Sequence, residues 1–508
     1  MRRYSTLNII LAGYNIDYEI LKEIMSSGAD SNILKGSRAP TPETISAAYA
    51  RISRDPMPAP ELRKKARREV EKARMSNRNI VFGMGHSSIA EHAVFNIDVL
   101  GVSRLLVEEI EKFRLCSYTE KSQRYVLLKD DFVVPEEIRP AGLKGSFIET
   151  VKEQNRLYHE LYSSLKPYVY EKNREMASDP ANHRTLDGWA KEDARYIISL
   201  STETQLGMTL NARNLELMLR RCAAHPTAEA KEYGRKLHQA TRDVAPSLVK
   251  YMEATEFDLM TRHSLRKKTD ELIEKRCGKS DFGELSRSVC AKRSAAGGRT
   301  DRTDIENNNV DLIYATPDAD DKIAASLIHS SSSIPLEKCM TLVSSMEKTE
   351  KEEIIKTAFL YMKPHDSALR EFENADLLFE LTVSASCFAQ LKRHRMATIN
   401  CQDYDPSLGV TMPPAVSEVG MEGRFRDIIS RTEETYDRLK KAAPDAAAYI
   451  LTNAHRKRVA MKVSARELYH IARLRLDGHA QWDIRETAGR MLRLSKEAMP
   501  LTLMSAAG

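Results

Sequence analysis

The stretch Gln390-Leu-Lys-Arg-His-Arg395 concentrates cationic side chains directly after a mostly apolar run, and its end has a diverged counterpart in Lys112-Phe-Arg114. Two further pairs occur in the same order along the chain, Leu7–Asn15 with Asp311–Asp318 and Asn211-Ala-Arg213 with Ser464-Ala-Arg466. The separation within these pairs shrinks from roughly 300 residues to about 250, so the pattern indicates one domain duplicated and diverged, with extra segments in the first copy. A solenoid of constant period is excluded.

Length and charge agree with a two-domain globular chain. The 508 residues are too many for one ordinary core and suit two domains of about 250. A hydrophobic content of 42% and a charged content of 30% favour packed domains over disorder. The net charge of +6, from 78 basic and 72 acidic residues, argues against a dedicated nucleic-acid coat protein and leaves room for small anionic ligands.

The sequence gives no indication of a membrane span, a disulfide framework or a metal site. No window approaches eighteen consecutive apolar residues, and the apolar run Leu7–Ala12 is shorter than a signal-peptide core. The seven cysteines are widely spaced, with no C-x-x-C, which favours reduced thiols. His86 and His92 are six residues apart and would lie on opposite helix faces. We therefore expect a cytoplasmic protein without a metal.

The chain divides into three parts that differ in amino-acid composition and pattern. Residues 1–260 form the first predicted domain, with a β-like run at Leu7–Leu11 and helices expected at 60–75, 100–112, 147–172 and 210–222. Residues 261–309 pass from Lys/Arg-rich to Ser/Gly/Asn-rich sequence and are interpreted as a connector, helical in part at its start. Residues 310–508 form the second predicted domain, which opens with a short buried strand at Asp311–Asp318.

The first copy contains two polar segments that could bind a ligand. Gly85–His92 presents two imidazoles, hydroxyls and Glu91, either as a helix cap with Glu91 on a backbone amide or as a site for a polar or anionic ligand. Further on, Glu120, Ser122 and Arg124 alternate, so in an extended segment they would share one face and could surround a phosphate and a polar ring. A plain polar strand edge is the alternative.

The second copy places arginines where packing does not require them. Arg393 and Arg395 could grip a diphosphate while His394 rests against a planar ring, although such triplets are often solvated helix ends. Ser464 and Arg475 share a helix face, and core packing does not explain an arginine on that stripe. Gly478 is expected to end this helix before another begins.

Together these segments resemble the flavin-dependent thymidylate synthase family over nearly the whole chain, as two tandem copies. The family pattern runs Gly-His-x-Ser-x-x-Glu-His, then Arg-His-Arg-x-x-Ser-x-Asn-Glu-x-Ser-x-Arg-Tyr, then Asn-x-Arg-x-Leu and Arg-x-x-x-His-Ala-Gln-x-Glu-Ile-Arg. Each copy matches only part of it. The resemblance implies an α+β fold in which a central β-sheet is flanked by helices, present twice.

The two copies retain complementary parts of the pattern. The first keeps Glu120, Ser122 and Arg124 but has Lys112-Phe113 for Arg-His, while the second keeps the Arg-His-Arg segment but has Asp403 and Asp405 for the serine and arginine. The resemblance thus implies one complete composite site for dUMP and a reciprocal site that has lost its arginines. Its substrate-binding residues would be Gln390, Arg393, Glu120, Ser122, Arg124, Arg195 and Arg475, with Arg475, Arg393 and Ser122 closest to the chemistry.

The implied reaction is reductive methylation of dUMP to dTMP, with methylenetetrahydrofolate as carbon donor, FAD as cofactor and NADPH as its reductant. FAD would contact His86, Ser88, Glu91, Asn211, Arg213, His394, Arg395, Met396 and His479. The family also implies a homodimer that forms a pseudo-tetramer, with neither nucleic-acid nor membrane partners. Two alternatives remain: an enzyme of the same fold and flavin acting on another nucleotide-like ring, and a non-catalytic nucleotide-binding homologue.

Overall fold

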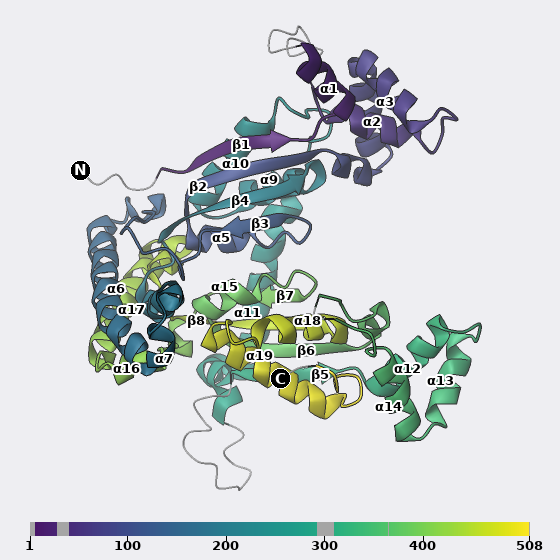
Figure 1. The fold of residues 1–508 in the computed structure, drawn as a ribbon. Coiled ribbons are helices and arrows are strands. Elements are labelled where there is room, and N and C mark those ends of the chain that lie inside the picture. Colours follow the sequence, from purple (N-terminus) through teal and green to yellow (C-terminus); the bar gives the residue numbers. More distant parts are fainter. Residues whose placement is uncertain (1–5, 28–39, 292–308, 364, 507–508) are drawn as a thin grey trace. The chain divides into compact units, whose positions relative to one another are not determined.

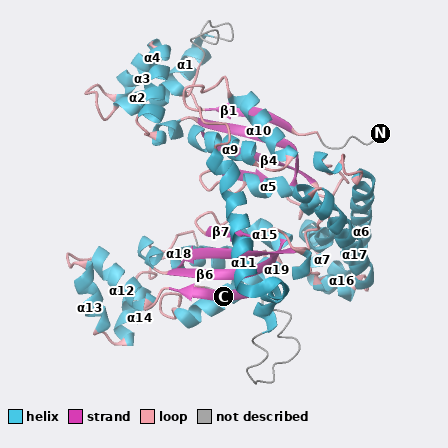
Figure 2. Cartoon of the chain, turned by 180° about the vertical axis from the view of Figure 1, so that it is seen from behind, coloured by secondary structure: helices cyan, strands magenta, loops and turns pink. Residues whose placement is uncertain are grey.

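The computed structural model describes residues 6–27, 40–291, 309–363 and 365–506. Its elements form two sets, each with four strands separated by helices, which Figures 1 and 2 show from opposite sides. The first set comprises β1 (Asn8–Tyr14), α1 (Tyr18–Ser27), α2 (Glu43–Arg51), α3 (Ala59–Arg68), α4 (Val70–Arg78), β2 (Val94–Ser103), α5 (Arg104–Ile110), β3 (Ser117–Glu120), α6 (Lys144–Lys172), α7 (Arg174–Ala177), α8 (His183–Ala194), β4 (Glu203–Asn211), α9 (Ala212–Ala224), α10 (Ala228–Thr241) and α11 (Glu256–Ala291).

The second set has the same succession of four strands with fewer helices between them. It comprises β5 (Val310–Ala315), α12 (Ala319–Ser330), α13 (Leu336–Ser344), α14 (Lys348–Thr357), β6 (Asp376–Ser384), α15 (Ala385–Leu391), β7 (Thr398–Cys401), α16 (Pro414–Glu418), α17 (Glu422–Ala442), β8 (Arg456–Ser464), α18 (Ala465–Arg475) and α19 (Trp482–Ala498).

Each set builds one four-stranded antiparallel sheet, and the two sheets have the same topology. Their strand orders are β1-β2-β4-β3 and β5-β6-β8-β7. Even the irregularities correspond, because the first strand of each sheet shifts register near its middle, at Leu11/Gly13 and at Leu312/Tyr314. The α+β fold and its duplication, predicted from the sequence, are confirmed.

The compact units of the structure exchange segments between the repeats. Unit 1 consists of Met1–Arg156, Ser199–Lys279 and Ser430–Ile450, and unit 2 of Leu157–Ile198, Ser280–Ile429 and Leu451–Gly508. Each unit thus contains the sheet of one repeat and a helical segment of the other. The division of the sequence at 260 and 310 separates the repeats and remains a prediction for the domains.

Unit 1 buries the apolar face of its sheet beneath α9 and α10. Side chains alternate along β2, where Phe95, Ile97 and Val99 face inward and are at most 1% exposed. A second cluster in the same unit joins Phe147 and Val151 of α6 to Leu439 of α17 and to Tyr449. The segment from the second repeat is therefore part of the core of this unit.

Unit 2 is built on the same plan around β6. Leu377, Phe379 and Leu381 are fully buried and pack with residues of α15, α18 and α19 in one core. α15 begins at Ser384, whose Oγ accepts a hydrogen bond from the amide of Cys387 (3.0 Å). In the first repeat Ser103 caps α5 in the same way.

The structure departs from one helix expectation and agrees with the expected helical start of the connector. The helix expected at 100–112 begins only at Arg104, because residues 94–103 continue as β2, whose inward side chains fill the core. The expected connector contains α11 up to Ala291, and residues 292–308 lie outside the described residues. Throughout the part of the chain that the structure describes, no helix is long and apolar enough to cross a bilayer.

Candidate functional site

The arginine that ends α18 lies against two other predicted site residues of unit 2. Arg475 Nε donates to His394 Nε2 (3.0 Å), and its Nη2 donates to the carbonyl oxygen of Gln390 (3.1 Å). These contacts explain why an arginine lies on an otherwise apolar helix face. They also bring Arg475 to two residues that lie 81 and 85 positions earlier in the sequence.

His394 is only 2% exposed, and its neighbours determine where its proton lies. Burial lowers the pKa of the imidazole, the Glu467 carboxylate opposes this shift, and the Arg475 guanidinium reinforces it. Because Arg475 Nε always carries a hydrogen, His394 Nε2 must accept, and the proton of the neutral ring resides on Nδ1. That atom lies 3.3 Å from Glu467 Oε1.

Gln390 connects this arginine to a segment contributed by the first repeat. Gln390 Nε2 donates to Gln481 Oε1 (3.2 Å), and Gln481 Nε2 donates to the hydroxyl of Tyr196 (2.7 Å). Tyr196 stacks on Trp482 with ring centroids 5.7 Å apart. Three of these side chains are buried, so the connection runs through the core of unit 2.

Arg195, which precedes Tyr196, is also buried in unit 2. Its carbonyl oxygen accepts a hydrogen bond from Asn453 Nδ2 (2.9 Å). The predicted nucleotide arginine of the first repeat therefore belongs to the same compact unit as Gln390 and Arg475 of the second repeat.

Two carboxyl groups in this region have raised pKa values. Asp483 accepts hydrogen bonds from Ser384 Oγ (2.6 Å) and from the Tyr196 hydroxyl (2.9 Å), and burial raises its pKa. Asp193 accepts from Trp482 Nε1 (2.9 Å), and burial raises its pKa to about 7. Both groups hold the first-repeat segment in place, because they contact Tyr196 and Trp482.

The remaining predicted residues of the second repeat are exposed. Arg393, Arg395 and Met396 lie in the turn between α15 and β7, and His479 lies between α18 and α19. The positions of α18 and α19 match the prediction that the first helix ends before Gly478. The exposed side chains are accessible to a ligand, whereas His394 is enclosed by its protein neighbours.

In unit 1, Glu120 is buried and bound to a residue that the sequence did not single out. Its carboxylate pairs with Arg104 and accepts a hydrogen bond from Thr204 Oγ1 (3.2 Å). Burial alone would lower the pKa of Arg104, but the adjacent carboxylate raises it above its usual value. Glu120 is thus fixed by an ion pair in the unit's interior.

Ser122 and Arg124 follow Glu120 but do not continue its strand. β3 ends at Glu120, and the amides of Arg124 and Val126 donate to Ser122 Oγ and to the Ser122 carbonyl oxygen (both 3.2 Å). The extended segment expected from the alternating pattern is therefore a turn. The turn keeps Ser122 and Arg124 close together, but they do not share a strand face with Glu120 as the sequence pattern predicted.

The five residues predicted to bind flavin in the first repeat all belong to unit 1. Glu91, on the 3-10 helix Ser87–His92, pairs with Arg213 Nη1 (2.5 Å), and Asn211 Oδ1 caps α9 by accepting from the amide of Asn214 (2.9 Å). His86 and Ser88 are exposed at the start of the 3-10 helix. Because Glu91 contacts Arg213 and not a backbone amide, the capping-box alternative is wrong.

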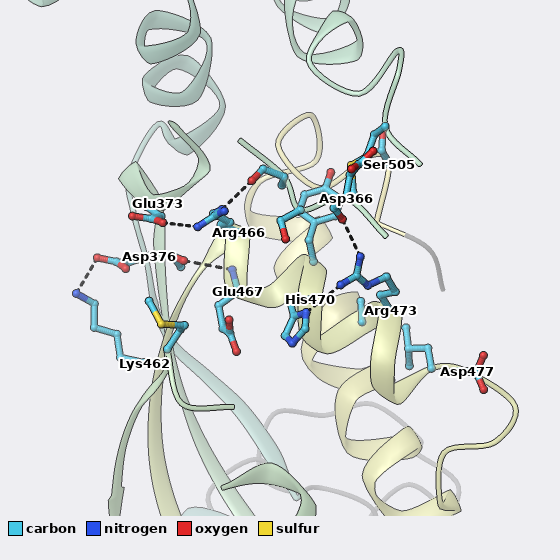
Figure 3. A pocket seen from close by; sticks show the side chains of 18 of the residues that line it. Asp366, Glu373, Asp376, Lys462, Arg466, Glu467, His470, Arg473, Asp477 and Ser505 are labelled. Carbon is cyan, nitrogen blue, oxygen red and sulfur yellow. Dashed lines mark hydrogen bonds and ion pairs between the residues drawn. The ribbon is translucent and has the colours of Figure 1, made fainter. Parts of the chain in front are cut away.

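The corresponding place in unit 2 contains a cavity of about 880 Å³ (Figure 3). Here Glu373 pairs with Arg466 (2.8 Å), as Glu91 does with Arg213. Figure 3 shows Arg466, Glu467, His470 and Arg473 projecting from α18 into this region. Met396 and Ser464 also contribute to the wall of the cavity.

Sequence reasoning missed Glu467, Tyr196 and Arg104. Glu467 follows Ser464 at the spacing of a helix-capping pair. This spacing suggests a capping role from sequence and gives no sign of the contact between Glu467 and His394. Tyr196 adjoins Arg195 but has no polar motif around it. Only the fold shows that these side chains reach their partners.

Comparisons with known proteins agree with the two sheets. Residues 36–247 and 311–501 both match the family described as "thymidylate synthase complementing protein". The flavin-dependent thymidylate synthase of Clostridium tetani is 29% identical over 215 residues, which cover 42% of this chain and 82% of that protein. That of Geobacter sulfurreducens is 27% identical over 210 residues, covering 41% and 81%.

A third relative extends over both repeats. The UPF0159 protein of Thermoplasma acidophilum is 23% identical over 456 residues, which cover 83% of this chain and 86% of that protein. Since the two family matches extend over most of the chain and one falls on each repeat, the chain belongs to the thymidylate synthase complementing protein family and carries its domain as two diverged tandem copies.

Proposed function

We propose that the chain is a flavin-dependent thymidylate synthase whose nucleotide site draws residues from both repeats. The observation that carries this proposal is the joint presence of Arg195, Gln390 and Arg475 in unit 2. Arg195 comes from the first repeat and the other two from the second, so one compact unit contains polar residues of both repeats, which supports the proposal.

The side chains suit an anionic nucleotide. Arg393 is exposed, and Arg475 is already oriented by His394 and Gln390, so the two can bind a phosphate and stabilise negative charge on a pyrimidine ring. Arg124 and Ser122 would add further donors from the first repeat. In the reciprocal positions Asp403 and Asp405 would repel a phosphate.

No side-chain nucleophile is required in this proposal. Ser122 is held in a turn by the amide of Arg124 and is assigned to binding. The arginines would fix the ring and polarise it, which contributes to rate through orientation and electrostatic stabilisation. Methylenetetrahydrofolate would supply the carbon.

The first-repeat cluster fits FAD by the chemistry of its donors. Arg213 and Glu91 form a half-exposed pair, and His86 and Ser88 present an imidazole and a hydroxyl beside it, which suits a polar, anionic dinucleotide. Arg395, Met396 and His479 would contact it from the second repeat. When bound, the flavin supplies the reducing equivalents of the methylation, with NADPH as their source.

The assembly that we propose is a cytoplasmic homodimer in which four repeats form a pseudo-tetramer. It would contain two intact nucleotide sites and two reciprocal sites that lack the arginines. The partners are then a nucleotide and a folate, without nucleic acid or membrane.

Rescue of a thymidine-requiring bacterial strain tests the proposal. Growth without thymidine is expected from the wild-type chain, but not from Arg124→Ala or Arg393→Ala, which should abolish nucleotide binding. Asp405→Ala should rescue like the wild type, because its carboxylate only caps the turn at Ser407 (2.9 Å). Equal rescue by all three variants would refute the composite site.

Flavin content separates the alternatives. A purified protein that binds FAD but does not rescue would favour an enzyme of the same fold acting on another nucleotide-like ring. This second candidate rests on Asp403 and Asp405, which stand where the family pattern has a serine and an arginine. A protein with no affinity for flavin would favour the non-catalytic homologue.

A further inference from the structure

We propose that Glu467 is a positioning residue that orients the nucleotide arginine Arg475 through His394. The proposal rests on the proposed function in that it takes a nucleotide as the ligand of Arg475. We define the Arg475 network as Gln390, His394, Glu467 and Arg475. None of the sequence motifs assigns a role to Glu467.

The direction of donation is fixed at each contact of the network. Arg475 Nε can only donate, so His394 Nε2 accepts at 3.0 Å. Nδ1, which then carries the ring proton, lies 3.3 Å from Glu467 Oε1 in a close contact that does not meet hydrogen-bond geometry, and the carboxylate attracts this N–H electrostatically. Glu467 thereby selects the one neutral tautomer of His394 that can bind Arg475.

Burial makes this selection effective. His394 is 2% exposed and Glu467 is 8% exposed, so bulk water does not compete freely for the ring nitrogens. The charged and titratable groups around the imidazole are Glu467, Arg475 and His470, whose ring centroid lies 5.8 Å away. Protonation of the ring would place a second N–H against Arg475 Nε and break that hydrogen bond.

The first repeat has none of these groups in the matching positions. Phe113 stands where His394 does, and Asn214 stands where Glu467 does. Asn214 donates to Asn211 Oδ1 and supports the start of α9 (2.8 Å). The network therefore occurs in the repeat that retains the predicted nucleotide arginines. A role in stabilising the fold alone would not explain why the other repeat lacks it.

Glu467 also lines the 880 Å³ cavity beside α18 (Figure 3). It consequently has room on its other side, and substitution there need not disturb the core. Glu467→Met removes the acceptor while keeping a side chain of similar length, and Glu467→Gln keeps an acceptor oxygen without charge. Glu373→Met is the matched control, because Glu373 lines the same cavity but pairs with Arg466.

The experiment measures dUMP affinity by calorimetry from pH 5 to 8, together with the nitrogen chemical shifts of 15N-histidine-labelled protein. His394 signals are assigned by their loss in His394→Asn. We expect the wild-type protein to show the Nδ1–H tautomer. At pH 8, Glu467→Met should bind dUMP about tenfold more weakly, the loss typical of one hydrogen bond to a charged group.

The conservative variant separates positioning from packing. Glu467→Gln should bind dUMP at pH 8 within about threefold of wild type, since its amide oxygen still accepts from Nδ1–H. Its loss of affinity on acidification should begin at a lower pH, because the carboxylate raises the pKa of His394. The control Glu373→Met should match the wild type in both respects.

Three results would overturn the inference: an Nε2–H tautomer in the wild type, wild-type affinity in Glu467→Met, or equal losses in the Met and Gln variants. A wild-type protein that binds no dUMP would instead refute the proposed function. In that case the nitrogen shifts still decide whether Glu467 fixes the tautomer of His394.

Discussion

Units 1 and 2 share one buried polar arrangement, which in unit 2 continues to the half-buried Arg475. In unit 1, Glu229 accepts hydrogen bonds from Ser103 Oγ and from the hydroxyl of Tyr449 (both 2.7 Å). In unit 2, Asp483 accepts in the same way from Ser384 and Tyr196. In both units the tyrosine comes from the other repeat, so this carboxylate fastens the exchanged segment.

The two units differ in the side chains that lie beyond this carboxylate and its hydrogen-bond partners. Unit 2 continues through Gln481 and Gln390 to Arg475. Unit 1 has buried Cys222 near the position of that arginine, and burial raises the pKa of this thiol to about 12. The shared part of the arrangement thus serves the fold, and the part that differs contains residues that we propose for the nucleotide site.

The largest expected effect comes from removing the arginine that distinguishes unit 2. Arg475→Ala should weaken dUMP binding by about 100-fold or more, because it removes a charged donor and the partner of His394. Calorimetric titration measures the loss. Arg221→Ala is the control in unit 1, where the half-exposed Arg221 lies 3.9 Å from the buried carboxylate of Asp258. A comparable loss in both variants would contradict the assignment.

The shared carboxylates should contribute similarly to stability. Asp483→Ala and Glu229→Ala each leave a serine and a tyrosine hydroxyl without their buried acceptor, so each should lower the free energy of unfolding by about 2 kcal/mol. Urea titration compares the two. Only Asp483→Ala should also weaken dUMP binding. If Glu229→Ala weakened dUMP binding equally, the two units would not differ in function as we infer.

The pH dependence should reveal a group that unit 1 lacks. The pKa of Asp193 is raised from 3.8 to about 7, so the folded protein keeps its proton where the unfolded chain has lost it. Stability from this group is complete below about pH 4 and falls as pH rises toward 7. Ala446 occupies the matching position in unit 1 and cannot titrate.

Replacing Asp193 by Asn should flatten this dependence. We expect a gain of about 4 kcal/mol relative to wild type at pH 8, the equivalent of the pKa shift from 3.8 to about 7, and little difference at pH 4. Thermal unfolding at the two pH values measures the change. The opposite trend, with Asp193→Asn less stable at pH 8, would show that the ionised carboxylate is stabilising.

Sequence reasoning predicted the duplication, the α+β class and the helices around Arg475, because these depend on local pattern and on motif order. It could not predict that Tyr196 and Tyr449 cross between repeats, since no local pattern encodes a hydrogen bond over more than 200 positions. The turn at Ser122 was missed because alternating polar residues are equally compatible with a strand and with a loop edge. The partner of a side chain such as Glu467 depends on how the helices pack, which the local sequence does not specify.

The smallest expected effect compares the two Glu–Arg pairs at the starts of α9 and α18. Arg213 is about half exposed, so Arg213→Ala should change stability by less than about 1 kcal/mol. If the first repeat binds FAD, the same variant should nonetheless take up flavin several-fold more weakly, measured by absorbance after dialysis. Arg466→Ala should lose more stability, because Arg466 also donates to the carbonyl oxygen of Ala368 (2.7 Å), yet keep wild-type flavin content. A reversal, with flavin lost from Arg466→Ala alone, would assign the cofactor to the cavity of the second repeat.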